Sequence, residues 1–263
     1  MKILLKITLL LTMVLAISGC KITSVSEGQD KSVRVCRNTT KTILNSYAEL
    51  KIPDNLKSDH PIRKETDFRL ASVVEKLDFV KVNERFQVDY VYSYRNSMGF
   101  PLVYSLPASE KRFENEDDYK KGKSMAFTYA LETDFSQWGF LQLAILEELG
   151  GQFYQYYQAE YDDVTVICDI DDVENLIDVL DSEGVHPAFN WWQKMRALTI
   201  SETDPIIYLD QAGGSAVVSM LVFDHELGIL RRDYTYTYGF PHKLLKTEDK
   251  LIVGYSSQPS ESK

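Results

Sequence analysis

The chain has 263 residues, and its content of 44% hydrophobic and 12% aromatic residues is sufficient for the packed core of one large domain or two small ones. Its 39 acidic residues against 29 basic residues give a formal net charge of −10, which argues against binding to nucleic acid or anionic lipid headgroups, because both need a basic surface. A cationic partner fits this charge, but a solvated acidic surface is the usual explanation.

The first twenty residues have the pattern of an export signal that ends in a cysteine. Lys2 and Lys6 precede an apolar stretch from residue 7 to residue 17, which is shorter than the about 20 residues that a membrane span needs. The stretch ends in ISGC, residues 17–20, which resembles the lipobox of bacterial lipoproteins: an aliphatic residue, two small residues and a cysteine. An ordinary signal peptide with a coincidental cysteine, or an uncleaved amphiphilic segment, is the alternative.

The resemblance to bacterial lipoproteins implies a processed and acylated N-terminus. In that family the cysteine thiol receives a diacylglyceryl group, the leader is removed just before it, and the new amine is acylated. Cys20 is then the first residue and the membrane anchor of a mature chain with 27 basic and 39 acidic residues, a net charge of −12. Lys21 rather than aspartate follows, which implies the outer membrane, facing the periplasm, in a Gram-negative cell, or the outer face of the single membrane in a Gram-positive cell.

The rest of the chain indicates a short tether followed by one domain. Residues 20–34 are polar and weakly periodic, which favours a flexible tether from the lipidated Cys20. Residues 35–263 contain no second apolar span, internal repeat or low-complexity linker, so we expect a single globular domain. Two further cysteines, Cys36 and Cys168, fit a disulfide in an exported protein, although Cys168 ends an apolar run and a small buried residue is the alternative.

The first half of the domain indicates a short helix and alternating strands. A helix is expected after Asp67, because apolar residues recur there at helical spacing. Residues 86–94 alternate between two faces, which predicts a half-buried strand, and turn residues at 96–99 lead to its hairpin partner at 100–106. Another alternating run at 125–131 predicts a further strand.

The middle of the domain is expected to contain three helices and two strands. Apolar residues at helical spacing begin at Trp138, and Gly150 and Gly151 end that helix. A second helix opens with a capping-box pattern, and a third has a proline suited to its first turn. In chain order these elements are a helix capped by Asp134 or Ser136, strands at 152–160 and 164–168, and helices opening at Asp171 and Pro187.

The last quarter predicts four strands, at 205–210, 216–224, 229–238 and 250–255. Their connections are short, so neighbouring strands must be antiparallel, because parallel pairs need a long crossover. The fold class that we expect is therefore α+β, with an antiparallel sheet of about seven or more strands packed by about three helices.

No catalytic motif stands out in the sequence. There is no nucleophile elbow, Walker loop or Rossmann glycine loop, and the four histidines lack the close spacing of zinc ligands. The acidic stretch 160–172 has its carboxylates separated by a strand, which puts them too far apart for one calcium ion. We therefore expect no cofactor and no metal site, and a binding protein rather than an enzyme.

Tyrosine is the residue type with the most distinctive placement in the sequence. Two strands each present three tyrosines on one face: Tyr90, Tyr92 and Tyr94 in the first, and Tyr234, Tyr236 and Tyr238 in the second. Such faces suit stacking with a glycan or an extended peptide, because a tyrosine has an apolar body and a polar edge. The same alternation builds a core face, and we expect the inward orientation, because Phe86 and Val88 share the first face.

The leading interpretation is a non-enzymatic, lipid-tethered envelope protein that binds another protein or a cell-wall component. Two alternatives stay open. One is a periplasmic immunity protein, for which a strongly acidic lipoprotein is suited, and the other is an envelope hydrolase whose site is assembled from residues distant in sequence. A deep pocket with converging titratable groups would favour the hydrolase.

Overall fold

The computed structural model describes residues 23–96, 98–155, 164–182 and 189–254. The chain divides into two compact units, residues 1–31 and residues 32–263, and the second is described below. The expected signal peptide and Cys20 lie outside the described residues. No helix within the described ranges has the length and apolar character needed to cross a membrane.

Helix α2, Thr23–Ala48, begins within the segment for which the sequence suggested a flexible tether. From residue 32 onward, buried side chains recur along it every three or four residues, which places them on one face. Packing of this face, rather than intrinsic propensity, accounts for the helix. The buried residues are Ser32, Val35, Cys36, Thr39, Ile43 and Tyr47.

Strands β2, Phe86–Arg95, and β3, Met98–Pro107, form the antiparallel hairpin that the alternation and the turn residues predicted. One face of β2 belongs to the main core. The opposite face is buried as well, because Val91 packs with Tyr104 of β3 and with Tyr119 of the short helix α4, Glu116–Lys121. The strand that was expected to be half-buried is therefore covered on both faces.

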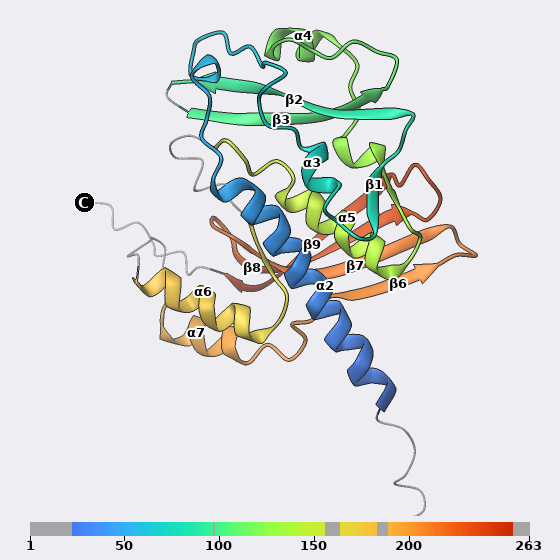
Figure 1. Cartoon of the computed structure of the whole chain (residues 1–263). Coiled ribbons are helices and arrows are strands. Elements are labelled where there is room, and N and C mark those ends of the chain that lie inside the picture. Colours follow the sequence, from blue (N-terminus) through green and yellow to red (C-terminus); the bar gives the residue numbers. More distant parts are fainter. Residues whose placement is uncertain (1–22, 97, 156–163, 183–188, 255–263) are drawn as a thin grey trace, which may run out of the picture. The chain divides into compact units, whose positions relative to one another are not determined.

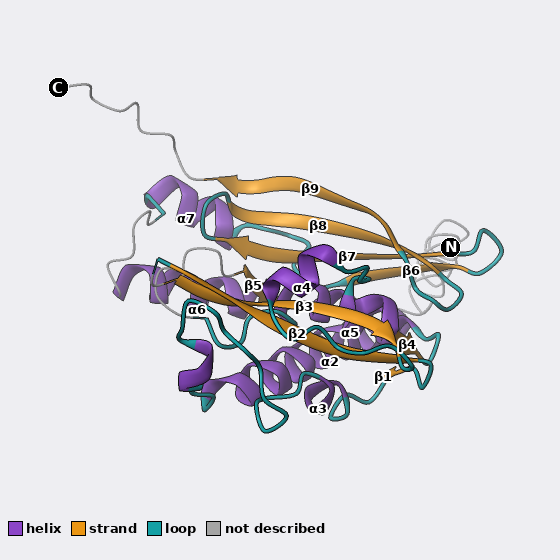
Figure 2. Ribbon diagram, turned by 90° about the horizontal axis from the view of Figure 1, so that it is seen from above, coloured by secondary structure: helices purple, strands orange, loops and turns teal. Residues whose placement is uncertain are grey.

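The main sheet has five strands, and every pair in it is antiparallel. Its central strand β7 pairs with β8 along one side and with both β5 and β6 along the other. Figure 2 shows β9, β8 and β7 side by side. The strands are β5, Val164–Ile167, β6, Ile206–Asp210, β7, Ser215–Asp224, β8, Gly228–Thr237, and β9, Leu244–Gly254.

Helix α5, Gln137–Leu149, lies between the β2–β3 hairpin and the main sheet (Figure 1). Ser136, one of the two predicted caps, begins the helix, since its hydroxyl accepts a hydrogen bond from the Gly139 amide. Ten of the thirteen residues are buried, which is expected of a helix that is apolar on all sides.

Two further helices pack on the other face of the sheet. They are α6, Ile170–Ser182, and α7, Trp191–Leu198, and both contribute to a second core with side chains of β5, β7 and β8. The side chains of β5 alternate between the two cores, with Val166 in the core that contains α5 and Ile167 in the core that contains α6. A cap by Asn190 begins α7 after the expected start at Pro187, a residue outside the described ranges.

The remaining elements are short. Residues 125–131, expected as a strand, form a 3-10 helix and the start of a short strand instead, because Phe127, Thr128 and Ala130 are all buried and do not alternate. Residues 152–155 contain a bend at 153–154 rather than the start of a strand, and residues 156–160 lie outside the described ranges. The short elements are η1, Asp54–Leu56, α3, Ala71–Val74, β1, Val80–Val82, η2, Phe127–Ala130, and β4, Leu131–Thr133.

The α+β class with antiparallel sheets is confirmed, but the expected single sheet of about seven or more strands is not formed by the described residues. Their strands belong to three sheets, the β1–β4 pair, the β2–β3 hairpin and the five-stranded sheet. The hairpin cannot join the main sheet, because α5 lies between them. The described part of the chain also contains six α-helices rather than about three.

Candidate functional site

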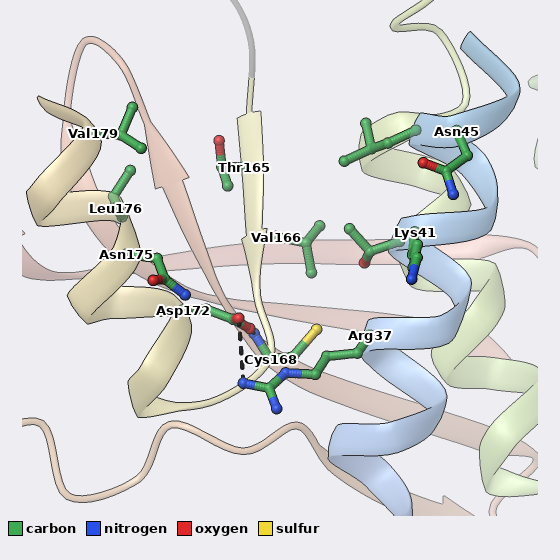
Figure 3. A pocket seen from close by; sticks show the side chains of 12 residues that line it. Arg37, Lys41, Asn45, Thr165, Val166, Cys168, Asp172, Asn175, Leu176 and Val179 are labelled. Atoms are coloured by element: carbon green, nitrogen blue, oxygen red, sulfur yellow. Dashed lines mark hydrogen bonds and ion pairs between the residues drawn. The ribbon is translucent and has the colours of Figure 1, made fainter. Parts of the chain in front are cut away.

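A groove between α2 and α6 has a volume of about 580 Å³. Figure 3 shows the two helices on either side of β5, with side chains from all three elements directed toward the space between them. We call this cavity the α2–α6 groove. It lies along one edge of the main sheet.

Strand β5 is an edge strand in the described structure. It pairs with β7 on one side, and among the described residues no strand pairs with its other side, which faces the groove. Alternate residues of an antiparallel strand direct their backbone groups away from the partner strand. The Val164 carbonyl accepts a hydrogen bond from Gln152 Nε2 at 3.0 Å, and the Cys168 amide donates to Asp172 Oδ2 at 2.8 Å. Both groups therefore point away from β7. Val166 lies midway between these two residues in the alternation, so its backbone groups also point away from β7 and face the groove.

A disulfide closes one end of the groove. Cys36 of α2 and Cys168, just after β5, are bonded to each other, with their Cα atoms 5.7 Å apart. The bond links segments separated by 132 residues, so in the chain-entropy model it stabilises the fold by about 4–5 kcal/mol. It also holds one wall of the groove at a fixed distance from the strand.

An ion-pair cluster lies beside the disulfide. The Arg37 guanidinium donates to Asp169 at 2.6 Å and to Asp171 and Asp172 at 3.4 Å. Burial acts to lower the pKa of Arg37, but the charges of Asp172 and Asp169 outweigh burial and raise the pKa above its usual value. Burial raises the pKa of Asp169 in spite of the hydrogen bond from the Asp172 amide. The cluster joins α2 to the first turn of α6.

The walls of the groove are largely apolar, and polar groups lie among them. Leu44 of α2 and Val179 of α6 have 44% and 47% of their surface exposed, so both present aliphatic surface to a ligand. Asn45 and Asn175 add a carboxamide on each side, and Lys41 adds a positive charge. Aliphatic walls suit apolar side chains, and carboxamides suit the N–H and C=O groups of a peptide backbone.

The groove lacks the arrangement of a nucleophilic active site. Cys168 is bonded to Cys36 and therefore offers no thiolate. Among the described residues that line the groove, the titratable side chains are Arg37, Lys41 and Asp172, and none of them is a histidine. Within the described ranges, no group of three His, Cys, Asp or Glu side chains could hold a metal ion.

The tyrosines of the two expected faces do not form a binding platform. Tyr90, Tyr92, Tyr234 and Tyr236 are each 1% exposed or less. The Tyr92 hydroxyl donates to the Tyr154 carbonyl at 2.6 Å, and the Tyr234 hydroxyl donates to Glu148 of α5. Both sets point into the core around α5, as the inward orientation required, while Tyr94 and Tyr238 are partly buried at its margin.

The sequence pattern predicted two of the three groove elements, β5 and α6, but not the wall formed by α2. A signal was present, because buried residues follow one another at helical spacing from Val35 to Tyr47. The polar composition of residues 20–34 led to the tether interpretation instead. The exposed Leu44 and Val179 carry no sequence signal, because a single surface aliphatic residue is common in any protein.

No protein-family model, no curated protein and no solved structure matches this chain.

Proposed function

We propose that the protein is a lipid-anchored protein of the cell envelope, held by acyl chains on Cys20. The support is the sequence ISGC at residues 17–20, preceded by a positively charged and then apolar leader. Several acyl chains give stable anchoring, whereas a single chain binds a membrane reversibly. Mass spectrometry of the N-terminal peptide from the native host tests this proposal. Acyl mass on Cys20 is expected, and a bare thiol there, or a mature chain that begins elsewhere, contradicts it.

We further propose that the protein has a binding function, carried by the α2–α6 groove, and that the ligand is an extended peptide segment of a partner protein. The observation that carries this proposal is the side of β5 on which no described strand pairs, where the backbone groups of Val166 face a cavity with aliphatic walls. An added strand pairs with main-chain groups of an edge strand, and its alternate side chains enter flanking pockets. The groove supplies an edge strand and pockets together.

The polar groups of the groove favour a peptide over a purely apolar ligand. Asn45 and Asn175 offer donors and acceptors to a peptide backbone, whereas a hydrocarbon ligand would leave these groups desolvated. Lys41 has no ion pair with any other described residue, and it favours a segment with an acidic side chain near this wall. The Cys36–Cys168 disulfide fixes the groove before binding, which lowers the ordering cost of association.

Panning of a linear peptide library against the full chain, purified in detergent with its disulfide intact, tests the groove. Selected peptides are then measured on the Leu44→Asp variant, which places a charge in the apolar wall. Leu245→Asp is the matched control, because Leu245 is 59% exposed on β9 and outside the groove. We expect at least about tenfold weaker binding to Leu44→Asp and unchanged binding to the control.

Three results contradict the groove proposal. They are a failure to enrich any peptide, equal binding to Leu44→Asp and the parent chain, and a dimer in light scattering that the same substitution dissociates. The third result would assign the groove to a second copy of this chain. Hydrogen exchange adds a local readout, because a bound strand should slow exchange of the Val166 amide.

A further inference from the structure

A second cavity, of about 310 Å³, has a strongly basic lining in a chain whose formal net charge is −10. It is formed by α3, β1, β2 and the loops next to them, and it is separate from the α2–α6 groove. We call it the arginine cavity. Its cationic side chains are Arg63, Arg69, Lys81 and Arg112.

The deepest of these cations is fixed by its neighbours. The side chains of Arg63 and Asp89 are only 9% and 3% exposed, and Arg63 Nη1 lies 2.8 Å from Asp89 Oδ1. Arg63 Nη2 donates to the Phe68 carbonyl at 3.4 Å, and the guanidinium lies over the ring of Tyr90, 4.8 Å from its centroid. Arg63 therefore forms a positively charged floor that is held by Asp89, and its buried Nε has no hydrogen-bond partner among the described residues.

Two arginines at the mouth keep hydrogen-bonding capacity. Arg112 uses its Nε, which lies 3.2 Å from Asp89 Oδ2 and donates to Gln87 Oε1 at 3.0 Å. Its terminal nitrogens have no hydrogen bond to any described residue. Arg69 is exposed, and its guanidinium has no hydrogen bond or ion pair within the described ranges. Both guanidinium groups can therefore donate to a ligand in the cavity.

The charge balance of the cavity selects a monoanion. Lys81 is paired with Glu132 at 3.4 Å, so it contributes no net charge. The three arginines face two carboxylates, Asp89 and Glu75, which leaves one positive charge in excess. A ligand with a single negative charge neutralises this excess, whereas a dianion would bring negative charge in surplus next to Asp89.

The remaining lining is apolar. Val82 of β1 and Phe86 of β2 contribute an aliphatic and an aromatic surface next to the arginines. A bare inorganic anion would leave this surface in contact with water, whereas a ligand with an apolar body would cover it. The volume is at the lower end of the range for small-molecule sites.

We propose that the arginine cavity binds a small monocarboxylate with an apolar or aromatic body. Arg69 and Arg112 donate to the carboxylate, since a guanidinium fork matches the two oxygens of that group. Val82 and Phe86 contact the apolar body. This site is independent of the α2–α6 groove, so either one can exist without the other.

Isothermal titration calorimetry with benzoate, on the full chain in detergent at low salt, tests the proposal. Arg69→Gln removes one donor without removing a described structural contact, and Arg34→Gln is the control, because Arg34 is an exposed arginine of α2 that does not line the cavity. We expect Arg69→Gln to weaken benzoate binding by about tenfold or more and Arg34→Gln to leave it unchanged.

Two analogues complete the experiment. Benzyl alcohol keeps the ring and loses the charge, and we expect no measurable binding. Phenyl phosphate adds a second negative charge, and we expect it to bind more weakly than benzoate. The proposal is overturned by an absence of benzoate binding, by equal binding to Arg69→Gln, by binding of benzyl alcohol as strong as that of benzoate, or by a preference for phenyl phosphate.

Discussion

The two long hairpins, β2–β3 and β8–β9, each contain one strand with alternating tyrosines, but their surroundings differ. Both carry tyrosines at alternate positions, and both direct them toward α5. The hairpin β2–β3 is also covered on its second face, by α4 and the loop before it, whereas most of β9 is exposed on both faces. Alternation therefore identifies the inner face of a strand, but whether the outer face is covered depends on distant segments.

The largest expected effect concerns the tyrosines that both hairpins place in the core. Tyr92→Ala and Tyr236→Ala should each lower the free energy of unfolding by about 3–5 kcal/mol, because each removes a large buried aromatic side chain. Tyr208→Ala on β6, which is 65% exposed, is the control and should change it by less than about 0.5 kcal/mol. Urea denaturation measures all three. Unchanged midpoints for both core variants would show that these faces do not form a core.

The second prediction separates the outer faces of the two hairpins. Val91→Thr on β2 should cost about 1–3 kcal/mol, because a hydroxyl would replace a methyl group in the fully buried cluster with Tyr104 and Leu106. Thr235→Val makes the reverse change on the outer face of β8, where the side chain is only partly buried, and should change stability by less than about 0.5 kcal/mol. Equal changes in the free energy of unfolding for Val91→Thr and Thr235→Val would contradict the conclusion that the outer face of β2 is buried more completely than that of β8.

These two hairpins also show how far the sequence could predict the structure. The boundaries of β2, β3 and β8 to within two residues, and the inward tyrosines, follow from local alternation and turn residues. The start of β9 was predicted wrongly, because the strand begins at Leu244 rather than at residue 250, and its first eight residues are exposed and carry no alternation. The separation of the β2–β3 hairpin from the main sheet does not follow from local patterns, because it depends on α5 lying between them, and a periodic pattern does not specify which sheet a strand joins. The sequence did not predict the arginine cavity, because Arg63 and Arg69 come from the loop before α3 and Arg112 comes from the loop after β3. Only the fold brings Arg63 and Arg112 together, at Asp89.

The third prediction concerns Glu147, whose carboxyl group lies on α5 next to β8. Burial raises the pKa of Glu147 above its usual value, with a smaller contribution from the charge of Glu148, while a hydrogen bond with Thr128 opposes the shift. Tyr236 also faces this group. The folded state then binds a proton more tightly than the unfolded state, so this group lowers stability as pH rises from the ordinary glutamate value through the raised value.

Replacing Glu147 should therefore stabilise the protein at neutral pH. Glu147→Gln is expected to raise the free energy of unfolding at pH 7 by about 0.5–1 kcal/mol, with the gain vanishing below the ordinary glutamate pKa, where the parent side chain is protonated in both states. Glu248→Gln on the exposed strand β9 is the control, and it should change the free energy of unfolding at pH 7 by less than about 0.5 kcal/mol. A destabilised Glu147→Gln variant at pH 7 would show that the carboxylate is favourable where it lies.

The smallest expected effect concerns two leucines that are partners across β8 and β9. Leu230 of β8 and Leu251 of β9 are opposite each other in the register, but Leu230 is 2% exposed and Leu251 is 55% exposed. Leu251→Ala should change the free energy of unfolding by less than about 0.5 kcal/mol, because little apolar surface leaves a buried environment. Leu230→Ala, measured in the same urea titration, should cost about 2–5 kcal/mol, because it leaves a cavity in the core.

A cost for Leu251→Ala similar to that for Leu230→Ala would mean that another surface covers β9 in solution, and the contrast between the two hairpins would then be lost. Such a surface would have to be polar as well as apolar, because Lys246, Glu248 and Asp249 lie along the same strand, and charged residues of this kind protect an edge strand against pairing with another chain.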